Sequence, residues 1–86
     1  MLQAPLYVPV NPGAYAQVLR LFRTASGKRT AAAFTSPLRL AKVLGSGQQW
    51  VRLSEPALRR MIAELDVIGV VIDPAGTMFR PAAKVA

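Results

Sequence analysis

The sequence lacks two of the residue types that many enzymes use for catalysis. The chain of 86 residues contains no histidine and no cysteine, which excludes an imidazole base, a thiolate nucleophile and the soft ligands of most zinc sites. Among the four acidic residues only Glu64 and Asp66 lie close together, and Asp73 before Pro74 has the position of a turn residue that ends a strand. We therefore expect no enzyme, no cofactor and no metal site.

The basic side chains are the second group with chemical potential, because their charge is unevenly placed. Residues 1–54 contain seven of the eleven Lys and Arg residues and no Asp or Glu, and the formal net charge of the chain is +7. Four of these residues flank a predicted hairpin turn and form the candidate polyanion-binding set: Arg20, Arg23, Lys28 and Arg29. An anionic partner such as nucleic acid would explain the asymmetry, and solubility alone is the alternative explanation.

The alternation of side chains along a strand divides this basic set between two faces. Arg20 shares one face with Val18 and Phe22, whereas Arg23 shares the other with Leu19 and Leu21. Few aromatic residues are interleaved with the basic ones, and no helix-turn-helix or RNA-recognition signature is present. Nucleic-acid binding is therefore the second hypothesis for the function.

Length and composition predict one small cytoplasmic domain that associates with another protein chain. We expect residues 1–86 to form a single domain, with an ordered core over about 5–74 and a partly flexible tail over 75–86. The hydrophobic content of 52% exceeds what one small core without disulfides can hide. The longest apolar run, residues 67–72, is of strand length, and the first ten residues lack the features of a signal peptide. No membrane span is expected.

Hydrophobic patterns and turn residues predict five strands and two helices. The strands are expected at residues 6–10, 18–24, 29–34, 49–53 and 68–72, with a further short strand at 77–79. The second and third strands should form a hairpin, because a turn containing Gly27 separates them. The first strand should be an edge strand or an arm near a sheet edge, because Pro9 has no N–H to donate to a neighbour.

Both helices are predicted from a repeated start signal. Thr35 and Ser54 each stand two residues before a proline, and their hydroxyl groups can cap the free N–H groups of a helix whose first turn tolerates proline. The first helix should run over 37–44 and end at Gly45. The second should present one apolar stripe to the core, made of Leu58, Met61, Ile62 and Leu65.

The order strand-strand-strand-helix-strand-helix-strand predicts an α/β (α+β) fold with a single small mixed sheet. Two strand-helix-strand crossovers of the same hand would make the last three strands parallel and pack both helices on one face of the sheet. The opposite face would then be open, although the strands are apolar on both faces. An exposed apolar sheet usually binds a partner. Anion binding at the two helix starts is a weaker alternative than ordinary capping.

The only tryptophan gives the open face a candidate anchor. Period-two alternation places Val51 and Leu53 toward the helices, and Trp50 and Arg52 on the opposite face. Tryptophan and arginine are both enriched among interface hot spots. The candidate interface set is therefore Val18, Phe22, Trp50 and Arg52. The alternative is that Trp50 closes the end of the monomer core.

Four short segments resemble a known family. They are the strand 6–10, Phe34-Thr35-Ser36-Pro37, the segment 50–53 with its preceding glycine loop, and Asp73-Pro74. Over roughly residues 5–74 the chain resembles the SseB-like amino-terminal domain, in particular short stand-alone actinobacterial members. The resemblance implies an α/β fold and neither catalysis nor a cofactor. The leading hypothesis is a non-enzymatic protein-interaction module, a homodimer or a subunit of a larger assembly, with nucleic-acid binding as the alternative.

Overall fold

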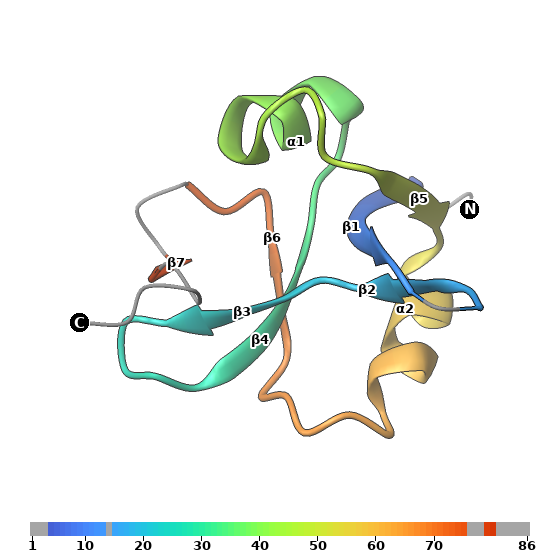
Figure 1. Ribbon diagram of the computed structural model, residues 1–86. Helices are drawn as coiled ribbons and strands as arrows, with labels where there is room; N and C mark the ends of the chain where they lie inside the picture. Colours follow the sequence, from blue (N-terminus) through green and yellow to red (C-terminus); the bar gives the residue numbers. More distant parts are fainter. Residues whose placement is uncertain (1–3, 14, 76–78, 81–86) are drawn as a thin grey trace.

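The computed structural model describes residues 4–13, 15–75 and 79–80, which contain two helices and seven strands (Figure 1). The mixed α+β class predicted from the sequence is confirmed. In chain order the elements are β1 (Leu6–Pro12), β2 (Gln17–Leu19), β3 (Leu21–Thr24), β4 (Arg29–Ala33), α1 (Pro37–Leu44), β5 (Trp50–Leu53), α2 (Glu55–Ile62), β6 (Val70–Ile72) and β7 (Phe79–Arg80).

Both helices form where the sequence predicts them, but the cap of α1 is Ser36 and not the predicted Thr35, whose hydroxyl donates to Asp73 instead. The Ser36 hydroxyl accepts a hydrogen bond from the Arg39 N–H at 3.1 Å, and the Ser54 hydroxyl accepts one from the Ala57 N–H at 3.2 Å. These bonds satisfy donors that have no partner inside the helix. Helix α1 ends at Gly45, whose φ of 96° is in the left-handed region that favours glycine.

The strands form two sheets, so the prediction of a single sheet is wrong. One sheet has the order β2-β1-β5 and the other has the order β6-β4-β3-β7. Among the described strands only the pairing of β4 with β6 is parallel. Strand β5 runs antiparallel to β1, which also corrects the prediction of three parallel strands. The sheets meet where the Tyr7 N–H donates to the Phe34 carbonyl at 2.7 Å and the Phe34 N–H donates back at 2.8 Å.

A break at Arg20 is the physical reason for the two sheets. The segment expected to form one strand over 18–24 is divided at this residue, whose N–H donates to the Pro9 carbonyl at 3.0 Å. The part before the break pairs with β1 and the part after it pairs with β4. The predicted hairpin is confirmed as β3 and β4, joined by the turn at Gly27.

Strand β1 is central in its sheet, which corrects the expectation of an edge strand. It pairs with β5 over Leu6 to Pro9 and with β2 over Val10 to Pro12. Pro9 is tolerated because it lies between the bridge at Tyr7 and the start of the β2 ladder at Val10. The Pro9 carbonyl accepts the Arg20 N–H, and no neighbouring strand requires an N–H from residue 9.

The helices pack against opposite faces of β4, so the prediction that both lie on one face is wrong. Ala31 and Ala33 belong to a buried cluster with residues of α2, whereas Ala32 belongs to a second cluster with Leu40 of α1. Successive residues of a strand point to opposite faces, and the small alanine side chains let a helix approach from each side. Figure 1 accordingly shows α1 and α2 at different ends of the molecule.

The apolar stripe predicted for α2 is only half buried. Leu58 and Ile62 lie in the core, at 0% and 7% exposure, while Met61 and Leu65 are exposed. The helix ends at Ile62, so Leu65 is no longer on the helical stripe. No helix in the part of the chain that the structure describes is long and apolar enough to cross a membrane.

Part of the predicted tail is included in the second sheet. Phe79 and Arg80 form β7, which pairs antiparallel with β3. Residues 76–78 and 81–86 of the tail lie outside the described residues. They include residues 77 and 78 of the strand expected at 77–79.

Candidate interaction surfaces

Strand β5 has one edge that no other strand of the described residues covers. It pairs only with β1 in its sheet. The Val10 N–H donates to the Gln49 carbonyl, whereas the Tyr7 N–H is directed away from β5 to Phe34. In an antiparallel ladder this alternation continues along the strand. Trp50 and Arg52 therefore direct their backbone N–H and C=O groups away from β1, toward the free edge.

The side chains of β5 alternate as predicted. Val51 and Leu53 pack against the core cluster that contains Leu58 and Ile62. Trp50 lies on the opposite face, where its ring makes an edge-on contact with the Tyr7 ring at a centroid distance of 5.1 Å. Trp50 is 40% exposed. Its ring therefore packs partly against its own chain and presents the rest of its apolar surface to solvent.

The structure separates the four residues of the predicted interface. Val18 lies opposite Asn11 on β1 and is 52% exposed, on the same face as Trp50 and Arg52. Phe22, in contrast, is only 6% exposed and packs in the cluster with Leu40. The break at Arg20 moves Phe22 into the other sheet, beneath α1. We call the exposed residues Val18, Trp50 and Arg52, with the free edge of β5, the β5 surface.

The structure also divides the predicted basic set. Arg20 is half buried: its guanidinium donates to the Gln48 side-chain carbonyl and lies over the Phe22 ring at 5.0 Å from the centroid. The Gln48 amide in turn donates to the Val10 carbonyl at 2.8 Å. Arg20 is therefore engaged between the two sheets and is separate from the rest of the set.

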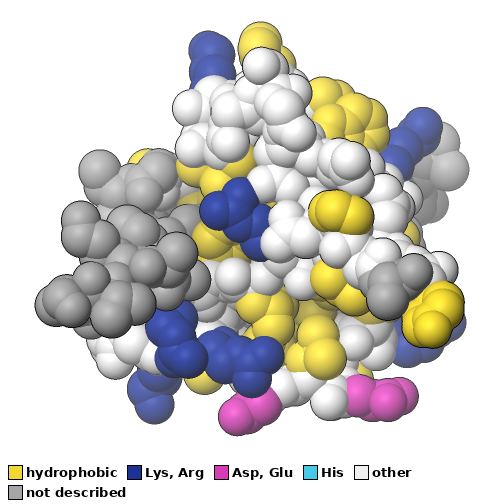
Figure 2. All heavy atoms as spheres, viewed as in Figure 1, with side chains coloured by type: hydrophobic (Ala, Val, Ile, Leu, Met, Phe, Trp, Pro, Cys, Tyr) yellow, Lys and Arg dark blue, Asp and Glu magenta, His cyan; other side chains and the backbone are white. Residues whose placement is uncertain are grey.

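The other three basic residues lie together at the hairpin. Arg23, Lys28 and Arg29 line a hollow of about 270 Å³, whose wall also contains Asp66 and Ile68. Figure 2 shows Lys and Arg side chains gathered at the lower left of the molecule, over the turn that joins β3 to β4, with an acidic side chain beside them. We call Arg23, Lys28 and Arg29 the hairpin cluster.

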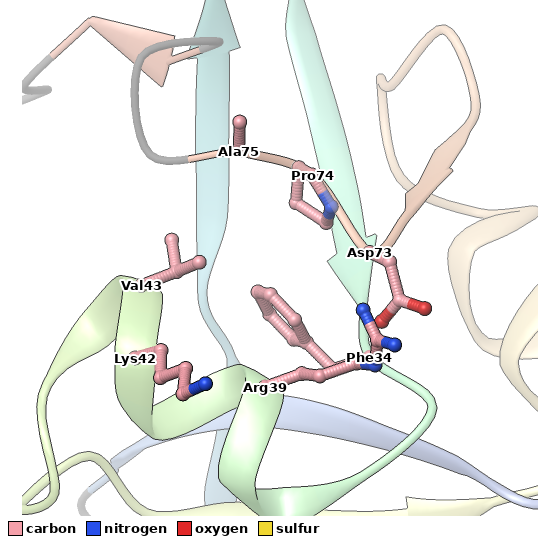
Figure 3. A pocket seen from close by; sticks show the side chains of 7 residues that line it. All are labelled: Phe34, Arg39, Lys42, Val43, Asp73, Pro74 and Ala75. Atoms are coloured by element: carbon pink, nitrogen blue, oxygen red, sulfur yellow. The ribbon is translucent and has the colours of Figure 1, made fainter.

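A second hollow, of about 250 Å³, lies between α1 and the segment after β6. In Figure 3, Arg39, Lys42 and Val43 come from α1, the Phe34 ring lies between the two segments, and the opposite wall is the run Asp73-Pro74-Ala75. The Asp73 carboxylate accepts hydrogen bonds from the Thr35 N–H at 2.8 Å and from the Thr35 hydroxyl at 2.7 Å. Asp73 has a φ of 53°, which is uncommon for a residue other than glycine.

The contact of Asp73 with Thr35 was not predicted from the sequence. The sequence predicts Asp73 only as a turn residue. The one pattern that relates it to Thr35 is that each follows a predicted strand and precedes a proline. The Asp73 carboxylate already lies at the start of α1, where its negative charge would repel a second anion. Glu55 occupies the first turn of α2 in the same way and is paired with Arg59 at 2.8 Å. Because β4 and β5 belong to different sheets, the two helix starts also do not share a sheet edge.

Acidic side chains do not converge on a metal site in the described ranges. There, no three His, Cys, Asp or Glu residues are grouped so that they could hold an ion. Asp73 is bound to Thr35, and Glu55 is bound to Arg59. The accessible features found in this part of the chain are thus surfaces and two open hollows.

These features define a small α+β domain built on two sheets, with a free strand edge and a basic hairpin. The chain belongs to the family of the SseB protein N-terminal domain, which matches residues 1–82. The resemblance inferred from the sequence is thereby confirmed at the level of the family. No curated protein and no solved structure matches the chain.

Proposed function

We propose that this chain is a non-enzymatic protein-interaction module that forms a homodimer through the β5 surface. The observation that carries the proposal is the coincidence, on one strand, of outward backbone groups and an exposed anchor. Trp50 and Arg52 direct their backbone groups to the free edge, and Trp50 is partly exposed beside it. Free strand edges are templates for pairing with another chain.

The pattern of β5 favours one register for two copies. A two-fold axis at Val51 places Trp50 opposite Arg52 of the second copy, twice, with their outward backbone groups facing each other. A cation beside an indole ring is attractive. A register that places Arg52 opposite itself would bring like charges together, which is unfavourable in a cross-strand pair. The chosen register joins two sheets of order β2-β1-β5 into one continuous sheet.

Of the interface residues predicted from the sequence, three support this proposal. Trp50 and Arg52 form the centre of the contact, and Val18 extends the exposed apolar face on the far side of β1. The buried position of Phe22 leaves it out of the proposed interface. If another protein rather than a second copy binds here, the same strand edge would receive it.

The test is the oligomeric state of the chain and two variants, measured by light scattering at tens of micromolar. Arg52→Pro removes an N–H that is directed away from β1, so the fold should persist while pairing at the edge is lost. Arg52→Ala is the matched control, because it removes the same side chain and keeps the N–H. We expect a wild-type dimer, a weakened dimer for Arg52→Ala and a folded monomer for Arg52→Pro. A wild-type monomer would refute self-association.

Two finer assignments accompany this proposal. The segments Phe34-Thr35-Ser36-Pro37 and Asp73-Pro74 support placing the chain among actinobacterial members of the family. We also propose a cytoplasmic location. Fractionation of the cells that make the protein tests the second assignment, and recovery in a membrane or secreted fraction would contradict it.

A further inference from the structure

Three arginines occupy equivalent positions on adjacent strands of the second sheet. Arg23 on β3 lies opposite Arg29 on β4 and, across its other edge, opposite Arg80 on β7. Directly opposed residues on neighbouring strands are about 4.5 to 5.5 Å apart between their Cα atoms, so the three positions span roughly 10 Å. The row crosses the strands, and two of its members, Arg23 and Arg29, also belong to the hairpin cluster.

The backbone pairing makes Arg23 and Arg29 close neighbours. The Thr24 N–H donates to the Lys28 carbonyl at 2.8 Å, which makes the next pair along the ladder, Arg23 with Arg29, a pair without hydrogen bonds. In such a pair the side chains lie closer together than in a hydrogen-bonded pair. Like charges directly opposite each other are destabilising.

Within the described residues no ion pair offsets this repulsion, and Asp66, which lines the same hollow, is the acidic residue beside the cluster. The ion pair found there is Arg59 with Glu55 on α2, and none involves the hairpin cluster. The Arg23 guanidinium gives one N–H to the Gly27 carbonyl at 2.8 Å, which leaves its other donors available. Arg23 and Lys28 are exposed and Arg29 is half buried.

We propose that the hairpin cluster of Arg23, Lys28 and Arg29 binds the phosphate backbone of nucleic acid. Guanidinium groups recognise phosphate oxygens with two parallel hydrogen bonds. Three cations around an open hollow suit a polymer with regularly spaced phosphates better than one small anion, which a closed pocket would hold. This proposal concerns a different surface from β5 and does not depend on the proposed dimer.

The lining of the hollow makes this binding independent of base sequence. Ile68 is its exposed apolar residue, and none of the described residues that line it is aromatic. Phe22, the aromatic residue of β3, is buried on the opposite face beneath α1. Base stacking on aromatic rings, which supports most single-strand binding, has no platform among the residues that line this hollow.

Asp66 provides an internal test because its carboxylate lines the same hollow. A carboxylate beside the hairpin cluster repels phosphate, so Asp66→Asn should strengthen binding by about two- to threefold at low salt. Glu64 is exposed and does not line the hollow. Glu64→Gln makes the same change in net charge and is the matched control, for which we expect a much smaller effect.

The experiment measures fluorescence anisotropy of short fluorescein-labelled DNA duplexes of two unrelated sequences, titrated with the protein over a series of salt concentrations. We expect equal affinity for both sequences and a slope of log affinity against log salt of about −3, as three to four phosphate contacts require. Arg23→Gln and Arg29→Gln should each reduce the slope by about one. Arg39→Gln, on α1 away from the hairpin cluster, is the control and should leave the slope unchanged.

Several results would overturn the proposal. If Arg39→Gln weakens binding as much as Arg23→Gln, the net charge of the chain and not the hairpin cluster is responsible. If polyglutamate of equal charge competes as well as unlabelled duplex, the surface is one for acidic protein. Binding that prefers one duplex sequence contradicts backbone recognition. Circular dichroism confirms that each variant is folded, and the gain expected for Asp66→Asn cannot arise from unfolding.

Discussion

Asp73 and Thr35 join the ends of the two parallel strands through both oxygens of one carboxylate. One oxygen accepts from the Thr35 N–H at 2.8 Å and the other from the Thr35 hydroxyl at 2.7 Å. Thr35 directly precedes Ser36, the cap of α1, and the Asp73 N–H donates to the Ala33 carbonyl at 2.8 Å. This pair of residues therefore fixes the point at which β4 ends, α1 begins and β6 ends.

Replacing Asp73 tests how much this junction stabilises the fold. Asp73→Ala removes both hydrogen bonds and leaves alanine at a φ of 53°, so we expect the free energy of unfolding to fall by about 2 kcal/mol. Asp73→Asn keeps one acceptor and tolerates the left-handed backbone, and should lose about half as much. Urea denaturation measures both values. Equal stability of the alanine variant and the wild type would contradict the assigned role.

Trp50 is expected to separate association from folding. Its edge-on contact with Tyr7 stabilises the monomer by about 0.5 to 1.5 kcal/mol, since that is the usual range for an aromatic pair. Trp50→Ala should therefore give a folded but less stable monomer with no dimer, in light scattering and urea denaturation. Trp50→Phe keeps a ring beside Tyr7 and should recover most of the stability. Loss of folding at every protein concentration would place Trp50 in the core and not at an interface.

Arg20 should matter for stability and not for nucleic acid. Its guanidinium is held by the Gln48 side chain and the Phe22 ring, so Arg20→Ala should lower the free energy of unfolding by about 2 kcal/mol. The salt dependence of duplex binding should stay as in the wild type, unlike that of Arg23→Gln. An Arg20→Ala chain that is fully stable but binds duplex with a smaller slope would reverse the roles assigned to the two arginines.

Gly45 and Gly47 form a matched pair for testing backbone conformation. A Cβ would contact nothing within 4 Å at either position, but only Gly45 has a left-handed φ, of 96°. Gly45→Ala should therefore cost about 1 to 2 kcal/mol through its backbone alone. Gly47→Ala should change the stability by less than about 0.5 kcal/mol. Thermal unfolding of the two variants checks this, and similar effects at both positions would contradict the explanation.

The sequence by itself determined the elements whose causes are local. The cap at Ser54, the end of α1 at Gly45 and the turn at Gly27 were predicted at the positions where they occur, and the cap of α1 was predicted one residue early, at Thr35. Each depends on hydrogen bonds and dihedral angles within about four residues of chain. The facing of Trp50 was also predictable, because alternation along a strand is a property of the strand alone.

Tertiary structure alone decided which strands are neighbours. Nothing local to Arg20 shows that its N–H will bond to Pro9, yet this contact divides the chain into two sheets and places Phe22 in the core. Likewise Asp73 meets Thr35, and Arg23 aligns with Arg29 and Arg80, only because β6 and β7 take the two edges of one sheet. Strand edges have the same backbone groups everywhere, so their pairing depends on packing across the whole chain, and no single segment contains that information.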